Sequence, residues 1–157
     1  MESKTVSYSR LETRYRPQPA EANNNGVMHG GHILFHLDSA AGMTAIRHAG
    51  CKVTTAAVDR MDFLRSIYPG ENIVIRTRMN MAGRSSMEIG AEVFAENAYS
   101  GEKVLAGRAF LVYVAIGDDG KSTPVPALLP ETDEDRHVMA EAEARQVQRR
   151  TERSLRK

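Results

Sequence analysis

A glycine-rich segment followed by a single acid is the part of this chain best suited to chemistry. The segment runs from Asn23 to Gly31 with the sequence NNNGVMHGG, and Asp38 follows it within a stretch of helical pattern. Backbone N–H groups at the start of a helix lack intrahelical partners and lie at the positive end of the helix dipole. They suit an oxygen atom that gains negative charge, as in acyl transfer. We therefore expect an acyl-transfer site at this helix start.

Asp38 is the acid available to such a site. It continues an apolar stripe formed by Leu34, Ala41 and Ala45 at helical spacing. An acid on an apolar stripe must be paired, hydrated or functional, because an isolated charge is costly to bury. Asp38 is therefore a candidate for catalysis, and the structural alternative is a satisfied acid or a helix cap.

Three histidines fall at helical spacings near the same helix start: His29, His32 and His36. The spacing places them near one face, as metal ligands require. Histidines near a helix start more often belong to a surface or an interface, so we expect no metal site. His29 lies directly beside the glycines, which makes it a candidate for contact with a substrate.

Composition excludes several classes of protein. Lys and Arg number 21 against 20 Asp and Glu, so a net charge of +1 gives no global field for nucleic acid or an anionic membrane. The single cysteine, Cys51, allows no internal disulfide and favours a reducing compartment. The first residues lack the apolar core of a signal peptide, and no stretch approaches the roughly 20 apolar residues of a membrane span. We expect one globular domain in the cytoplasm.

The periodicity predicts one strand, one long helix and four further strands. Residues 6–15 are compatible with a strand, residues 29–49 have helical spacing, and Gly50 is placed to end that helix. The later strands are expected at residues 53–63, 73–81, 87–93 and 104–116, the second and third forming a hairpin around 82–85.

Two further patterns refine this α+β arrangement. The middle of the helix, Ser39–Gly42, is poor in bulk, so a curved sheet can lie close to it. Alternation in the strand after the helix places these residues on one face: Val53, Thr55, Ala57, Asp59, Met61 and Phe63.

The composition changes near residue 129. We predict one domain over residues 6–128 and a charged tail over 129–157, acidic first and basic last. The polar pattern favours a solvated helix or a disordered tail, and the alternative is a segment that docks on a partner or an anionic ligand. Aromatic residues for base stacking are missing near the tail, so nucleic-acid binding is not expected.

The chain resembles a known family, the hotdog-fold acyl-CoA thioesterases of the acyl-CoA hydrolase type. Members of this family occur in bacteria and, as cytosolic thioester hydrolases, in animals. The resemblance covers about residues 8 to 116 in order and spacing. The motifs that carry it are Asn23-x-x-Gly26, His29-Gly30-Gly31, Leu37-Asp38, the strand 53–63, Pro69-Gly70-Glu71 and Gly83-Arg84-Ser85-Ser86. One departure is Glu21, where the family usually has an aspartate.

The resemblance implies a hotdog fold, in which a curved antiparallel sheet wraps the long central helix. It implies that two units pair into one continuous sheet, often as trimers of dimers, and that the active site lies at the dimer interface. The homodimer would then be the minimal active unit, and a monomer would be inactive. An enzyme of this kind would act in fatty acid metabolism on an acyl-CoA substrate. We expect it to bind neither nucleic acid nor a membrane.

The resemblance also implies roles for individual residues. Asp38 matches the family's catalytic acid, either as a general base on water or as a nucleophile. Asn23 matches the site asparagine, against a plain turn as the structural alternative. Gly30 and Gly31 match the glycines that supply the oxyanion donor, with the Gly31 amide as the first choice.

Substrate contacts are expected elsewhere. His29 lies beside these glycines. Arg84, Ser85 and Ser86 match the segment that holds the nucleotide end of coenzyme A, where a guanidinium and two hydroxyls suit phosphate oxygens. The alternative for these three residues is a solvated hairpin loop.

The function expected from this resemblance is hydrolysis of acyl-CoA to coenzyme A and a free acid, by water and Asp38. It requires no metal and no cofactor beyond the coenzyme A of substrate and product. A non-catalytic acyl-CoA binding or sensing module on the same fold is the first alternative. An interaction role for the basic tail is the second.

Overall fold

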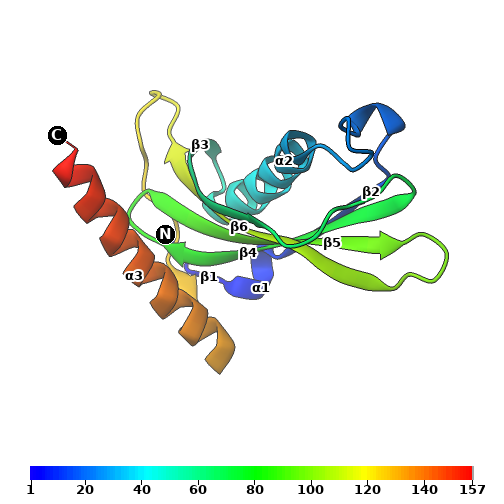
Figure 1. Cartoon of the computed structure of the whole chain (residues 1–157). Coiled ribbons are helices and arrows are strands. Elements are labelled where there is room, and N and C mark those ends of the chain that lie inside the picture. Colours follow the sequence, from blue (N-terminus) through cyan, green and yellow to red (C-terminus); the bar gives the residue numbers. More distant parts are fainter. Residues whose placement is uncertain (157) are drawn as a thin grey trace.

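The structure is a computed structural model that describes residues 1–156. Helix α2 lies against one face of a five-stranded antiparallel sheet, and helix α3 runs past the other face (Figure 1). The sheet has the order β2-β4-β5-β6-β3, and β1 and β7 form a separate parallel pair. The elements are β1 (Lys4–Thr5), α1 (Val6–Ser9), β2 (Leu11–Tyr15), η1 (Pro19–Glu21), α2 (Gly30–Ala49), β3 (Lys52–Phe63), β4 (Glu71–Ala82), β5 (Ser86–Asn97), β6 (Lys103–Ile116), β7 (Leu128–Leu129) and α3 (Asp133–Leu155).

Helix α2 occupies the residues that the sequence pattern indicated. His29 is its N-cap, and Gly50 is its C-cap with a left-handed φ of 71°, a conformation that favours glycine. We call the sheet face covered by α2 the inner face and the opposite one the outer face. The core between α2 and the inner face is apolar and includes Ile33, Leu37, Ala41, Met79, Met87, Ile89 and Leu111.

The strands confirm the predicted α+β hotdog arrangement, with one difference at the N-terminal end. Residues 6–9 form the helical turn α1, so β2 begins only at Leu11 rather than at residue 6. Val6 and Ser9 are buried in that turn, which shows that it packs as part of the molecule. The four strands after α2 and the β4–β5 hairpin lie where they were expected.

Strand β3 does not keep the predicted single face. Irregularities between Thr55 and Ala57 and between Val58 and Arg60 each place an extra residue opposite β6. A bulge of this kind shifts the alternation of side chains. Thr55 therefore contacts α2 on the inner face, whereas Asp59 contacts α3 on the outer face.

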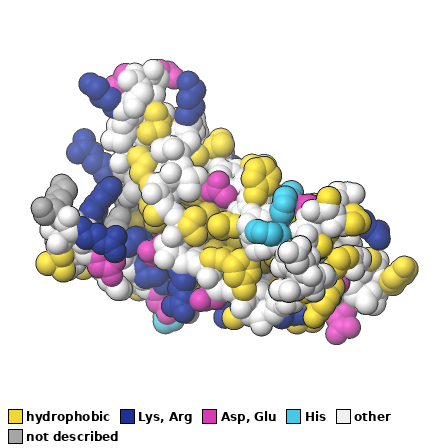
Figure 2. Space-filling view, turned by 45° about the horizontal axis from the view of Figure 1, so that its top comes forward, with side chains coloured by type: hydrophobic (Ala, Val, Ile, Leu, Met, Phe, Trp, Pro, Cys, Tyr) yellow, Lys and Arg dark blue, Asp and Glu magenta, His cyan; other side chains and the backbone are white. Residues whose placement is uncertain are grey.

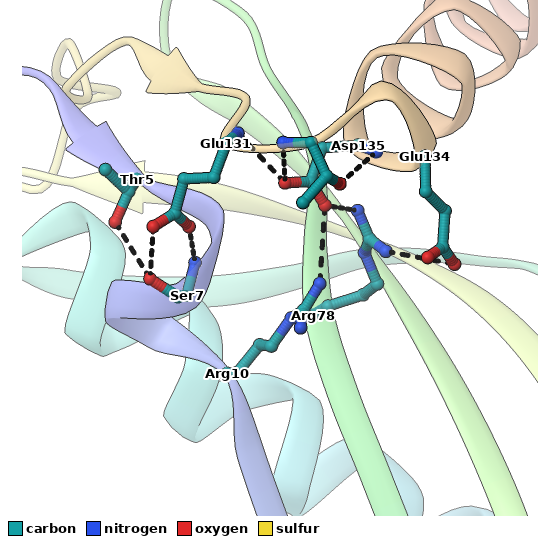
Figure 3. Close-up of polar contacts among 8 residues, drawn as sticks. Thr5, Ser7, Arg10, Arg78, Glu131, Glu134 and Asp135 are labelled. Carbon is teal, nitrogen blue, oxygen red and sulfur yellow. Dashed lines mark hydrogen bonds and ion pairs between the residues drawn. The ribbon is translucent and has the colours of Figure 1, made fainter.

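Asp135 anchors the start of α3 to the rest of the molecule (Figure 3). Its side chain is 2% exposed, and Oδ1 accepts from Arg78 at 2.7 Å and from Arg10 at 3.3 Å. Oδ2 accepts from the backbone N–H groups of Glu131 and Thr132 at 2.9 and 3.1 Å. The first turn of α3 is thus fixed to β4 and to the segment after α1.

Glu88 anchors the second half of α3. It is fully buried on the outer face of β5, where Arg145 donates to it at 2.7 Å and Arg149 at 2.8 Å. Asn80 donates to the same carboxylate at 3.2 Å, and Arg149 also binds Asp59 of β3 at 2.8 Å. Helix α3 therefore links β5 to β3 across the outer face.

The predicted C-terminal tail is helical over Asp133–Leu155, one of the two alternatives expected. Most of its side chains are exposed, while Asp135 and Ala142 are buried. The boundary between a domain over residues 6–128 and a tail stays a prediction, and Lys157 lies outside the described residues. None of the helices within residues 1–156 combines the length and apolar character that a membrane span requires.

Candidate active site

Asp38 projects from α2 toward two hydroxyl groups on the sheet. Its Oδ1 accepts from the Tyr113 hydroxyl at 2.7 Å and from the Thr55 hydroxyl at 3.0 Å. The Tyr113 hydroxyl also lies 2.8 Å from the Asp38 carbonyl oxygen, so its one hydrogen is shared between two acceptors. Asp38 is half-buried, and within residues 1–156 no hydrogen bond to its Oδ2 is present. One carboxylate oxygen is fixed and the other is available.

Tyr113 and Thr55 are site residues that the sequence did not single out. Burial, together with the Asp38 carboxylate, raises the pKa of Tyr113 above its usual range, so the phenol stays protonated and donates. A signal was present, because Tyr113 is the one tyrosine in the apolar run 104–116 and a buried tyrosine hydroxyl needs a partner. Thr55 offers no comparable signal, since threonine is common in strands.

The two glycine amides at the start of α2 differ in their bonding. The Gly31 N–H donates to Nδ1 of the His29 ring at 2.9 Å. The Gly30 N–H has no hydrogen-bond partner in the described part of the chain. The amide open to a ligand is therefore that of Gly30, whereas the sequence analysis favoured Gly31.

Asn23 lies in the loop that leads into α2. Its Oδ1 accepts from the backbone N–H groups of Asn25 at 2.9 Å and Val27 at 3.4 Å, and its own backbone N–H donates to the Val27 carbonyl at 2.8 Å. These bonds close a tight turn. The side-chain amide of Asn23 makes no hydrogen bond within residues 1–156, so it remains available as a donor.

The three histidines do not converge. His29 turns toward Gly31, while His36 Nε2 lies 3.3 Å from Glu21 Oε1 and His32 Nδ1 lies 3.8 Å from the same oxygen. The Gln18 N–H is the largest cause that holds the pKa of Glu21 below its usual value, and His36 and His32 act in the same direction. The cluster therefore fastens the loop to the first turns of α2.

An apolar cavity of about 320 Å³ opens beside Gly30. Phe63 lies over this glycine, because a Cβ added to Gly30 would be 3.2 Å from the Phe63 Cζ atom. Glycine at position 30 thus allows the aromatic ring to approach the helix start. The cavity is lined by Val27, Met28, Gly30, Ile33, Phe63, Leu64, Arg65, Ser66 and Ile67.

The predicted residues form two groups at different heights on α2. Gly30 and Asp38 are eight residues apart, which is about 12 Å at 1.5 Å of rise per residue. Asn23 and His29 belong with Gly30 at the helix start, and Tyr113 belongs with Asp38. This separation exceeds the size of one thioester carbonyl, so within one chain the two groups do not contact the same carbonyl.

Arg84 and Ser85 lie in the turn between β4 and β5, and Ser86 is the first residue of β5, where its hydroxyl accepts from the Gln146 side chain of α3 at 3.4 Å. Strand pairing places Met87, the next residue, opposite Tyr113. The turn therefore lies near the Asp38 group rather than near the helix start. Arg84 is exposed, and its guanidinium makes no hydrogen bond within residues 1–156.

A larger groove of about 710 Å³ lies on the outer face beside α3. Its arginines are paired with acids, such as Arg76 with Glu12 at 2.8 Å and Arg108 with Glu92 at 3.6 Å. None of the site residues predicted from the sequence lines it. We therefore place the candidate site on the inner face.

Exposed apolar side chains surround the inner-face site. Figure 2 shows hydrophobic side chains gathered across the middle of one face, with histidines beside them. Strand β3 is the edge of the sheet, and most of its side chains are exposed. An open edge next to an apolar patch is typical of an interface. The exposed apolar residues of α2, β3 and the residue after β3 are Phe35, Met43, Ile46, Val58, Phe63 and Leu64.

Comparison with known proteins agrees with this geometry. The thioesterase superfamily model matches residues 25–101, which include the helix start, Asp38 and Thr55. An uncharacterised acyl-CoA thioester hydrolase of Bacillus subtilis is 36% identical over 99% of this chain and 85% of its own length.

Solved structures of acyl-CoA thioesterases are also similar to this chain, in both sequence and fold. An apo-hexameric acyl-CoA thioesterase superposes with a TM-score of 0.92 and 33% identity, covering 99% of both chains. An acyl-CoA hydrolase of Staphylococcus aureus in complex with butyryl coenzyme A and coenzyme A gives 0.89 and 32%, covering 98% of this chain and 93% of that one. Structures of variants of that enzyme are also solved, in which an aspartate, an asparagine or a threonine is replaced by alanine. The chain therefore belongs to the thioesterase superfamily and is a hotdog-fold acyl-CoA thioester hydrolase.

Proposed function

We propose that the chain hydrolyses acyl-CoA by attack of a water molecule that Asp38 activates as a general base. The observation that carries this proposal is the bonding of the Asp38 carboxylate. Tyr113 and Thr55 fix Oδ1, and Oδ2 is left to take a proton from water. Water attacks the thioester carbonyl carbon, the C–S bond breaks, and the proton passes to the leaving coenzyme A thiolate.

The oxygen that becomes negative during this attack needs a donor. The unpaired Gly30 amide is the donor that we propose, because it lies at the positive end of α2 and Gly30 lines the apolar cavity. The Asn23 side-chain amide is a second donor, either to the thioester carbonyl or to the attacking water. The acyl group would enter the cavity, with Phe63 as one wall.

Two chains would be needed to assemble this site. If two copies pair antiparallel along β3 around a two-fold axis, the C-terminal half of one β3 lies beside the N-terminal half of the other. Phe63, in the C-terminal half, lies over Gly30, and Thr55, in the N-terminal half, binds Asp38. The Gly30 group of one chain would thus approach the Asp38 group of its partner.

The variants of the Staphylococcus aureus enzyme support the choice of residues. Its replaced asparagine, aspartate and threonine are separated by 15 and 17 positions. Asn23, Asp38 and Thr55 have the same separations and the same residue types. This correspondence supports the roles that we propose for these three residues.

Coenzyme A would contact both the Gly30 group and the Asp38 group. Arg84 has an exposed guanidinium, and the hydroxyl-bearing residues Ser85 and Ser86 follow it at the end of the turn and the start of β5, which suits phosphate oxygens. His29 would border the thioester end, next to the glycines. The proposed reaction uses only groups of the chain and of acyl-CoA, with no resident metal or redox cofactor. Assembly of dimers into a hexamer, a cytoplasmic location and a role in fatty acid metabolism stay predictions.

The experiment that tests this function measures thiol release from acyl-CoAs of increasing chain length. We expect release by the wild type and none by the folded Asp38→Ala or Asn23→Ala variants. A mixture of these two variants recovers about a quarter of the activity after subunit exchange, because half of the dimers contain one intact site of two. Recovery is the specific signature of a site shared between chains.

Two results would overturn the mechanism. Equal release by the wild type and Asp38→Ala would remove Asp38 from the chemistry. Oxygen-18 from solvent found in the Asp38 carboxylate after one turnover would show attack by the acid itself, whereas a general base places the label directly in the product acid.

A further inference from the structure

Helix α2 starts with two glycine amides of which only one is available. The His29 ring lies against Gly31, because a Cβ added to Gly31 would be 3.1 Å from the ring's Nδ1 atom. This is the contact in which Nδ1 accepts the Gly31 amide hydrogen at 2.9 Å. The adjacent Gly30 amide has no partner within residues 1–156 and lies at the cavity wall.

We propose that His29 is a positioning residue that determines which amide binds the substrate oxygen. By accepting from the Gly31 amide, the ring fixes the orientation of the Gly30–Gly31 peptide. It leaves the Gly30 N–H as the open backbone donor at the start of α2 within residues 1–156. The proposal rests on the proposed hydrolysis, since it assigns His29 a role in placing the oxyanion donor.

A cap is needed here because two consecutive glycines restrict the backbone very little. Glycine has the largest conformational freedom of any residue, so an uncapped Gly30–Gly31 turn would sample many amide directions. An N-cap side chain that accepts from the first turn removes this freedom. His29 performs that task with a ring that accepts through Nδ1 and therefore carries its hydrogen on Nε2.

The backbone of His29 is fixed as well. Its N–H donates to the Glu21 carbonyl oxygen at 2.8 Å. The Glu21 carboxylate accepts from His36 at 3.3 Å, and the His36 ring stacks on Tyr15 with a centroid distance of 3.7 Å. The cap is thus connected both to the loop that carries Asn23 and to the second turn of α2.

The test compares two ligands of the same chain length. An S-(2-oxoalkyl)-CoA keeps a carbonyl oxygen but has no thioester, and an S-alkyl-CoA lacks that oxygen. We expect the wild type to bind the oxo ligand more tightly than the alkyl ligand. We expect His29→Ala to reduce this preference roughly 3- to 10-fold, the range for one hydrogen bond, and to lower kcat more than it changes KM.

His29→Asn is the rescue variant, because asparagine is a strong N-cap that accepts the same kind of bond. It should recover most of the oxo preference and of kcat. His137→Ala removes an exposed histidine on α3 and should change neither quantity. Both are measured on protein with unchanged Tm and size.

Three results would overturn the proposal: an unchanged oxo preference in His29→Ala, an increased one, or a folded His29→Asn variant that behaves like His29→Ala. Failure of the proposed function is distinguishable, because it would show as no thiol release from any acyl-CoA by the wild type. The binding ratio reports on His29 in either case.

Discussion

Asp38 and Glu88 are acids on opposite faces of the same sheet, and their surroundings differ in kind. Asp38 receives two neutral hydroxyl groups on one oxygen and keeps the other oxygen open. Glu88 is fully buried and receives two arginines and the Asn80 amide, with both oxygens engaged.

The contrast shows which kind of carboxylate environment is suited to proton transfer. A carboxylate with arginines on both oxygens has no lone pair accessible to a substrate and is held as an anion by charge. A carboxylate held by hydroxyl groups is oriented without being neutralised, so it can still take a proton. This difference supports the proposal that Asp38 on the inner face takes part in the reaction, while Glu88 on the outer face holds α3 on the sheet.

The largest effect is expected from Asp38→Asn. The asparagine oxygen still accepts from Tyr113, so the fold is kept, but the base is lost. We expect kcat to fall roughly 10²- to 10⁴-fold, the range for loss of general base catalysis. Thiol release by size-checked protein measures this change, and Tm is expected to stay near that of the wild type. Turnover within a few-fold of the wild type would contradict the assignment of chemistry to Asp38.

Glu88→Ala should give the opposite result. It leaves Arg145 and Arg149 without their shared partner, and breaking a buried ion pair costs about 3–5 kcal/mol of unfolding free energy. Activity per folded molecule should be nearly unchanged, because no site residue contacts Glu88. Denaturant unfolding measures the loss.

Glu92→Ala is the matched control for Glu88→Ala. Glu92 lies on the same strand and the same face, but its side chain is 47% exposed beside Arg108. A surface pair contributes roughly 0–1 kcal/mol. An equal loss of stability in both variants would remove the distinction between a buried and an exposed acid.

Tyr113→Phe tests the orientation of Asp38 and should have a smaller effect. The ring still fills the core, but Asp38 loses its shortest hydrogen bond, at 2.7 Å. A hydrogen bond to a charged group contributes about 1.5–3 kcal/mol, so we expect kcat to fall roughly 10- to 100-fold. Thr55→Val is the companion variant, because it removes the second hydroxyl donor and keeps the shape of the side chain. A fall in stability without a fall in kcat would make Tyr113 purely structural.

The sequence predicted the elements well where one local signal dominated. The small-residue stripe of α2 and its Gly50 cap, and the hairpin around residues 82–85, follow from periodicity and turn chemistry. Strand β3 shows where local signals fail. Its bulges depend on how it pairs with β6, and the alternation of residue types along one strand carries no information about that pairing. The sequence analysis therefore placed Thr55 and Asp59 on one face.

The candidate site divides in the same way. Asp38 was found from its place on an apolar stripe, but its partners Thr55 and Tyr113 come from strands that only the folded sheet brings together. The capped state of the Gly31 amide depends on a rotamer of His29, which no sequence pattern specifies. The second anchor of α3 was missed because Glu88 looks like an ordinary polar residue in an alternating strand.

The smallest effect is expected from lowering the pH at Asp135, the other anchor of α3. This experiment extends the comparison to a third carboxylate, which is buried like Glu88. Burial opposes ionisation of Asp135, but the amides of Glu131 and Thr132 and the charge of Arg78 hold its pKa below the usual value. A lowered pKa stabilises the folded state above the unfolded pKa, and this stability is lost as the pH falls through the folded pKa. Hydrogen exchange of the α3 amides should therefore lose protection on acidification below about pH 4. In Asp135→Asn that protection should already be reduced at neutral pH and should depend less on acid, and an unchanged acid dependence in this variant would show that another carboxylate controls the docking of α3.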